Sequence, residues 1–188
     1  GLCGLAAIAI VFVGLRFLHG QNLKRASLTL GQMIELRATL ADQPGNLAKL
    51  EALQGKGRYG RLPYVLLSSY WIEKGEPAKA KDLLAKVGSS PRDFIYYQAQ
   101  DLLGRVNGLA RDYDQAVALY DKLEKDKPEA YPLDVVLSHK AEALEAKNDT
   151  AGALAIYKKL QEDYPRSYFG YEAAGKVRKL EGTGRLPM

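Results

Sequence analysis

The sequence predicts an all-α protein: a right-handed α-solenoid of about three helix pairs with a capping helix, preceded by a transmembrane helix. The main observation is that small residues recur 36 and 37 residues apart, at Ala80, Ala116 and Ala153. A larger residue follows each alanine after four positions, and a proline closes each unit. These residues are Leu84, Tyr120, Tyr157, Pro91, Pro128 and Pro165. A fixed period of this length indicates stacked supersecondary units.

The N-terminal segment differs from the rest of the chain, because residues 1–15 carry no charge. A membrane-spanning helix needs about 20 mainly apolar residues. We therefore predict a transmembrane helix over residues 1–20, truncated at its start, that contacts the lipid bilayer through residues 1–18. The alternative is the apolar region of a signal peptide, but no convincing small-x-small cleavage site follows it.

The charge distribution limits which classes of molecule we expect as partners of this chain. The formal net charge is +5, and residues 21–60 hold six basic against three acidic residues. This excess is typical of contact with anionic lipid headgroups, and a solvated helix face explains it equally well. No basic patch with interleaved aromatic residues occurs, so no nucleic-acid partner is expected.

Apolar periodicity and breaker residues predict the elements in order. Residues 21–60 form membrane-proximal helices over 21–41 and 46–54 and a glycine-rich linker over 55–60. Three helix pairs follow within residues 61–167, over 62–74 and 77–87, 93–109 and 113–125, and 134–146 and 150–163. Residues 168–188 are a capping helix, over 168–180, and a tail. Gly75 and Asn148 mark turns within pairs, Pro77 suits a first helical turn, and Asp112 suits an N-cap.

The helix pairs over residues 61–167 resemble tetratricopeptide repeats. That motif places a small residue early in the second helix, an aromatic residue or leucine one turn later, and a proline at the end. In the first helix of each pair, the residues at the positions of the motif are Leu67, Ser68, Trp71, Leu103, Gly104, Asn107, Lys140, Ala141 and Leu144. Asn107 and Lys140 depart from the usual apolar residues. The alternative, an ordinary antiparallel helical bundle, does not account for the period.

The order of segments also resembles the YfgM-type ancillary subunits of the bacterial Sec translocon. The residues concerned are the end of the apolar segment at residues 16–20, Lys24 to Ser27 and the glycine-rich entry at residues 58–62. This resemblance implies a single-pass inner-membrane protein with a periplasmic, chaperone-like repeat domain. It implies the Sec translocon and a membrane-anchored peptidyl-prolyl isomerase as partners. A cytoplasmic repeat domain stays open, because the positive-inside rule favours it for this basic flank.

We find no catalytic constellation, so the chain is not expected to be an enzyme. His19 and His139 have no cysteine or second histidine at ligand spacing, which argues against a metal site. The glycines at 55, 57 and 60 match a dinucleotide fingerprint, but a helical pattern precedes them where that motif needs a strand. No cofactor is expected.

The expected function is therefore protein binding by the concave face that the first helices of stacked pairs form. The candidate protein-binding residues are Val65, Ser69, Ile72, Gln98, Asp101, Arg105, Ser138, Glu142 and Glu145. Alternatively, several of them pack against the N-terminal helix. The second functional hypothesis is a structural accessory subunit of a larger membrane complex for respiration, transport or envelope assembly.

Overall fold

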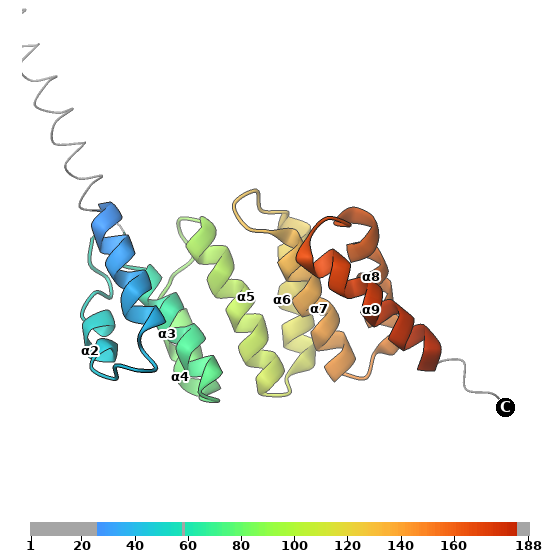
Figure 1. Ribbon diagram of the computed structural model, residues 1–188, viewed down its shortest axis with the longest axis horizontal. Helices are drawn as coiled ribbons and strands as arrows, with labels where there is room; N and C mark the ends of the chain where they lie inside the picture. Colours follow the sequence, from blue (N-terminus) through green and yellow to red (C-terminus); the bar gives the residue numbers. More distant parts are fainter. Residues whose placement is uncertain (1–25, 58, 184–188) are drawn as a thin grey trace, which may run out of the picture. The chain divides into compact units, whose positions relative to one another are not determined.

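The structure, a computed structural model, describes residues 26–57 and 59–183 (Figure 1). All regular elements within these two ranges are helices, beginning with one over residues 26–38. The others are α2 (Asn46–Glu51), α3 (Leu62–Glu73), α4 (Pro77–Ala85), α5 (Phe94–Leu109), α6 (Tyr113–Asp126), α7 (Leu133–Ala146), α8 (Thr150–Asp163) and α9 (Tyr168–Thr183). The all-α prediction is confirmed for these residues. Three boundaries differ by three residues: the helices predicted over 21–41 and 46–54 end at residues 38 and 51, and α9 continues to Thr183, where a tail was predicted.

None of the described helices combines the length and the apolar character that a membrane crossing requires. The transmembrane helix predicted over residues 1–20 lies outside the described residues. The predicted division of the chain at residues 20, 60 and 167 stays a prediction.

The chain divides into two compact units within α3, the first ending at Leu67 and the second beginning at Ser68. In the first unit, Arg37 Nε donates a hydrogen bond to the Leu66 carbonyl at 3.1 Å. The Asn46 side chain, buried at the start of α2, donates to Thr39 Oγ1 at 2.9 Å. The buried apolar residues of this unit are Met33, Leu36, Leu40, Leu50, Val65 and Leu67.

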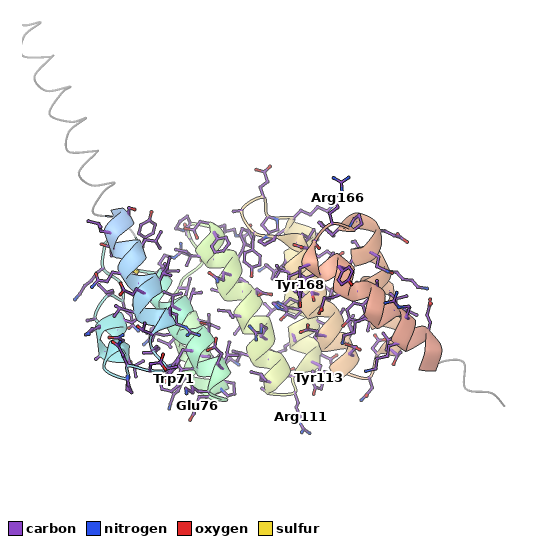
Figure 2. The ribbon with its side chains drawn as sticks, in the orientation of Figure 1. Trp71, Glu76, Arg111, Tyr113, Arg166 and Tyr168 are labelled. Carbon is purple, nitrogen blue, oxygen red and sulfur yellow. The ribbon has the colours of Figure 1, made fainter. Side chains whose placement is uncertain are left out.

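The second unit is built from helices that pack in chain order from α4 to α9 (Figure 1). In addition, α5 contacts α7, and α7 contacts α9, so the first helices of the second and third pairs are neighbours and the capping helix lies beside the latter. Figure 2 shows Glu76 and Arg111, at the turns within two pairs, along one edge of this unit, and Arg166, after α8, at the opposite edge. This alternation is the arrangement that the sequence period predicts.

The small residues of the period lie where the paired helices approach each other. Ala80, Ala116 and Ala153 are each 0% exposed, as predicted. A Cβ atom added to Gly104 on α5 would lie 2.5 Å from Cζ of Tyr120 on α6, closer than real Cβ contacts allow. Glycine at this position is therefore required by the tyrosine ring of the partner helix.

The turn within each pair repeats as well. Gly75, Arg111 and Asn148 have φ angles of 73°, 62° and 67°, and they stand 36 and 37 residues apart. After each one, the next backbone N–H donates to a carbonyl of the preceding helix at 2.8, 2.8 and 2.9 Å. This left-handed turn is a common way to end a helix and satisfies its last carbonyl groups.

The side-chain caps differ between pairs. Asp149 accepts a hydrogen bond from the Gly152 N–H at 2.9 Å, and Asp93 accepts one from the Tyr96 N–H at 3.1 Å. Asp112 stands at the N-cap position of α6, but its side chain makes no capping hydrogen bond, contrary to the expectation from its residue type.

Lys140 departs from the apolar pattern because its amine joins α7 to α6, and its partner Glu124 is also bound from α8. Its Nζ lies 2.7 Å from Asp121 Oδ1 and 2.7 Å from Glu124 Oε2, both on α6. Lys159 of α8 donates to the other oxygen of Glu124 at 2.5 Å. Burial by itself would raise the pKa of Glu124, but the hydrogen bonds from the two lysines outweigh it and lower that pKa below its ordinary value.

We expect Gly104→Ala to destabilise the protein by about 1–3 kcal/mol, because the new methyl group collides with the buried Tyr120 ring. Gly108→Ala, on the same helix with no atom within 4 Å of the added Cβ, should instead stabilise it by about 0.5–1 kcal/mol through helix propensity. Urea denaturation followed by circular dichroism measures both. If Gly104→Ala raised the free energy of unfolding as Gly108→Ala does, the proposed close contact would be wrong.

We expect the Glu124 carboxylate to stabilise the folded state in a pH-dependent way. Its folded pKa is lowered, so its contribution is present above the ordinary value of 4.5 and is lost as the pH falls through the folded value. Glu124→Gln should therefore cost about 1 kcal/mol at pH 7 and little near pH 2. Denaturation at a series of pH values tests this, with Glu162→Gln, an exposed residue of α8, as the control. A pH-independent difference would contradict the expectation.

Candidate functional site

An open pocket of about 380 Å³ lies among the first helices of the three pairs. The end of α3 contributes Ile72 and Glu73, and the remaining residues come from α5, from α7 and from the start and middle of α6. They are Gly104, Arg105, Gly108, Leu109, Tyr113, Tyr120, His139, Glu142, Ala143 and Ala146. We call this site the first-helix pocket. Its helices are neighbours because successive pairs stack, so the pocket follows from the repeat architecture.

A hydrogen-bonded network around Asp101 lies beneath the pocket. Asp101 is 3% exposed, and its carboxylate lies 2.7 Å from His139 Nδ1 and accepts from Tyr131 Oη at 3.0 Å. Tyr120 Oη donates to the Asp101 carbonyl at 3.4 Å. The network joins α5, α6, α7 and the loop before α7, and it satisfies a buried charge.

The two tyrosines of this network remain neutral. Burial is the largest cause that raises the pKa of Tyr120 and of Tyr131, and the charge of Asp101 raises both further. They therefore act as hydrogen-bond donors at neutral pH. The residues lining the pocket include no serine, threonine, cysteine or lysine that could serve as a nucleophile.

Charged and apolar groups alternate around the mouth of the pocket. Arg105 and Glu142 are exposed, and neither side chain makes an ion pair or hydrogen bond with the residues that the structure describes. Leu109, at the end of α5, is 54% exposed. In Figure 2, Tyr113 lies at the same edge of the unit as Arg111. Such a surface can hold an apolar side chain and a polar group of another molecule side by side.

The structure brings together three of the nine predicted binding residues, since Ile72, Arg105 and Glu142 all line the first-helix pocket, where Arg105 and Glu142 are exposed and Ile72 is 7% exposed. Ser69, Gln98 and Glu145 are partly exposed and lie outside the lining. Glu145 is already engaged, because it accepts hydrogen bonds from Tyr157 Oη at 2.7 Å and from Lys176 Nζ at 2.6 Å.

The other three predicted residues do not offer an exposed surface. Val65, Asp101 and Ser138 are 1%, 3% and 7% exposed. Asp101 takes part in the buried hydrogen-bonded network, and Ser138 is one of the buried residues of α7. For Asp101 the physical reason is cover by other elements: it lies four residues before the exposed Arg105 on the same face of α5, but Tyr131 and His139 bind its carboxylate and bury it.

Several lining residues were missed by sequence reasoning. His139 was not among the predicted binding residues, although it lines the pocket and binds Asp101. No sequence pattern distinguished the lining residues Leu109, Tyr113, Ala143 and Ala146. The only signal was that Leu109 is an apolar residue beside the turn after α5. No group of three or more histidine, cysteine, aspartate or glutamate residues that could hold a metal ion occurs in the described part of the chain.

The glycine-rich linker does not form a phosphate cradle in the residues described. The Gly55 N–H donates to the Gly60 carbonyl at 2.8 Å, so the loop closes on itself. A Cβ atom on Gly60 would lie 2.4 Å from the Lys56 nitrogen, which shows how tight this turn is. The preceding element is the helix α2, where a dinucleotide site would need a strand.

Comparison with known proteins gives one match. A family model described as a tetratricopeptide repeat matches residues 136–167, which cover most of α7 and all of α8. No curated protein and no solved structure matches the chain. The match and the all-helical structure support a tetratricopeptide-repeat protein with an α-solenoid fold. Repeats of this kind bind other proteins, which suggests an interaction scaffold.

Proposed function

We propose that this chain is a membrane-anchored scaffold of the bacterial envelope that holds a segment of another polypeptide in the first-helix pocket. The observation that carries the proposal is the pocket itself, in which three successive first helices present exposed charged and apolar side chains together. The tetratricopeptide match to the third pair supports protein binding as the activity. The chain then acts by holding a partner and catalyses no reaction.

The proposed location rests on the N-terminal sequence. The uncharged run over residues 1–15 is typical of a membrane anchor, and the basic excess over residues 21–60 suits contact with anionic headgroups. We propose an inner-membrane protein whose repeats lie in the periplasm, beside the Sec translocon and a membrane-anchored peptidyl-prolyl isomerase. The resemblance in segment order supports this placement.

A tryptophan substitution whose indole fills the first-helix pocket tests whether a partner binds there. Gly108 lines the pocket and has no atom within 4 Å of an added Cβ, so Gly108→Trp should occupy the pocket without repacking the fold. Gly175→Trp is the matched control, because Gly175 on α9 is equally open and lies outside the pocket. Random 12-residue displayed peptides are selected on the full chain, and the affinities of the enriched peptides are then measured.

We expect Gly108→Trp to weaken the selected peptides at least about tenfold, since it excludes them from their site, and Gly175→Trp to leave affinity unchanged. Unfolding curves verify that both variants fold equally well. Equal affinity for both variants, or the absence of any enriched peptide, would refute the proposal.

The proposed membrane location has a separate test. A photoactivatable residue placed within residues 1–18 of the full chain should crosslink to the translocon or the isomerase in native membranes. Crosslinks to subunits of a respiratory, transport or assembly complex would support the accessory-subunit hypothesis instead. This result would not depend on what the first-helix pocket binds.

A further inference from the structure

We infer that a second open pocket, between α4 and α5, binds an acidic side chain, a glutamate or aspartate, of a polypeptide partner. The pocket has a volume of about 440 Å³. One side is formed by α4 and the turn after it, the other by α5, with Lys81, Ala85 and Gly88 facing Tyr96, Gln100 and Leu103. We call it the α4–α5 groove. It shares no lining residue with the first-helix pocket, so the inference does not depend on the function proposed for that pocket.

The groove exists because α4 is shorter than the other second helices. α4 has 9 residues, whereas α6 and α8 have 14 each, although all three begin at the same position of the period. Gly88, in the turn after α4, has a φ angle of 75°, which does not continue a right-handed helix. A Cβ atom added there would have no atom within 4 Å. The space beside α5 is therefore open.

At the next junction, between α6 and α7, the chain itself fills the corresponding positions with carboxylates. Asp121 and Glu124 stand 36 residues after Ala85 and Gly88. Each lies 2.7 Å from the Lys140 amine. The α4–α5 groove thus lacks the two acidic side chains that the same positions of the period carry in the following pair.

The groove has an amine of its own, on the α4 side. Lys81 is exposed and is the one charged residue of the lining, while Asp82, the next residue, does not line the groove. The side chains of Lys81, Ser89 and Gln100 make no hydrogen bond or ion pair with the residues that the structure describes. An ammonium group forms its strongest hydrogen bonds with a carboxylate, and neutral donors beside it can bind the same oxygens.

Tyr96 adds a hydroxyl on an otherwise buried ring. This residue is 5% exposed, and its hydroxyl makes no hydrogen bond within the described part of the chain. No buried polar side-chain atom of those residues is left without a partner, so the hydroxyl must be in contact with solvent. It is a further donor available to a ligand in the groove.

Two effects that oppose an anion are weaker than the charge of Lys81. The end of a helix carries a partial negative charge, but the Leu84 carbonyl of α4 already accepts a hydrogen bond from the Val87 N–H at 3.1 Å. Asp126 lies 3.6 Å from Arg92, whose guanidinium lies 5.6 Å from the centre of the Tyr96 ring, so this carboxylate is compensated by a cation.

The apolar part of the lining identifies a side chain of a polypeptide as the occupant. A carboxylate carries one charge, which one lysine can match, and its methylene stem can pack against Ala85 and Leu103. The match of the third pair to a tetratricopeptide repeat supports a protein as the source of that side chain.

The probe is an array of immobilised, C-terminally amidated peptides of the sequence Ser-Leu-Xaa-Leu-Ser, in which Xaa is glutamate, glutamine or lysine. A second set carries glutamine at Xaa and a free C-terminal carboxylate. The full chain should bind the amidated glutamate peptide about two- to fivefold better than the amidated glutamine peptide, and the lysine peptide worst.

Lys81→Gln should remove the preference for glutamate over glutamine, and Lys81→Glu should reverse it in favour of lysine. Ala85→Asp places the aspartate of the period four residues after Lys81 on the same helix, and should remove the preference by pairing with that lysine. The control is Lys122→Gln, which changes an exposed lysine of α6 outside the groove and should leave the preference intact.

Equal binding of the amidated glutamate and glutamine peptides, or a glutamate preference that survives Lys81→Gln, would overturn the inference. Tighter binding of the free-carboxylate set than of the amidated glutamate peptide would also overturn it, because the occupant would then be a chain end. Gly108→Trp, which fills the first-helix pocket, should leave the glutamate preference unchanged, so this inference and the proposed function fail separately.

Discussion

The close approach of paired helices through very small side chains is the constraint on which the second unit depends. Ala80, Ala116 and Ala153 are fully buried, and Gly104 leaves only enough room for the ring of Tyr120. Interiors are packed to the density of organic crystals, so one extra methyl group at such a contact has no space. The distance and the rotation between the two helices of a pair are therefore fixed. The next pair then stacks on this pair in one arrangement.

The first-helix pocket is a consequence of this stacking. Behind the third pair, Lys176 of α9 lies near the Tyr157 ring and binds Glu145. His139, 37 residues before Lys176, lies with its ring 6.3 Å from the Tyr120 ring and binds Asp101, while Arg105 and Glu142 line the pocket beside it. Equivalent positions of the period thus carry a histidine in one place and a lysine in another, and each lies next to a carboxylate of the preceding first helix.

Buried polar groups tie the stacked pairs together where apolar side chains would otherwise be expected. The Asp101 carboxylate is satisfied by His139 and Tyr131, and Glu124 is held by lysines from α7 and α8. A buried or half-buried carboxylate is tolerated when hydrogen bonds replace its lost hydration. These contacts also select one register between pairs, because a shifted register would leave the charges without partners.

The sequence by itself determined the helix pairs and most of their boundaries. Prolines, left-handed turn positions and the recurring small residues are local signals, and each acts on the few residues around it. The tertiary structure alone decided which side chains of the first helices are exposed and which are buried. Asp101 and Arg105 are four residues apart on one helix, yet Asp101 is buried because Tyr131 and His139, distant in sequence, close over it. Helical spacing cannot reveal such a cover, since it comes from another repeat.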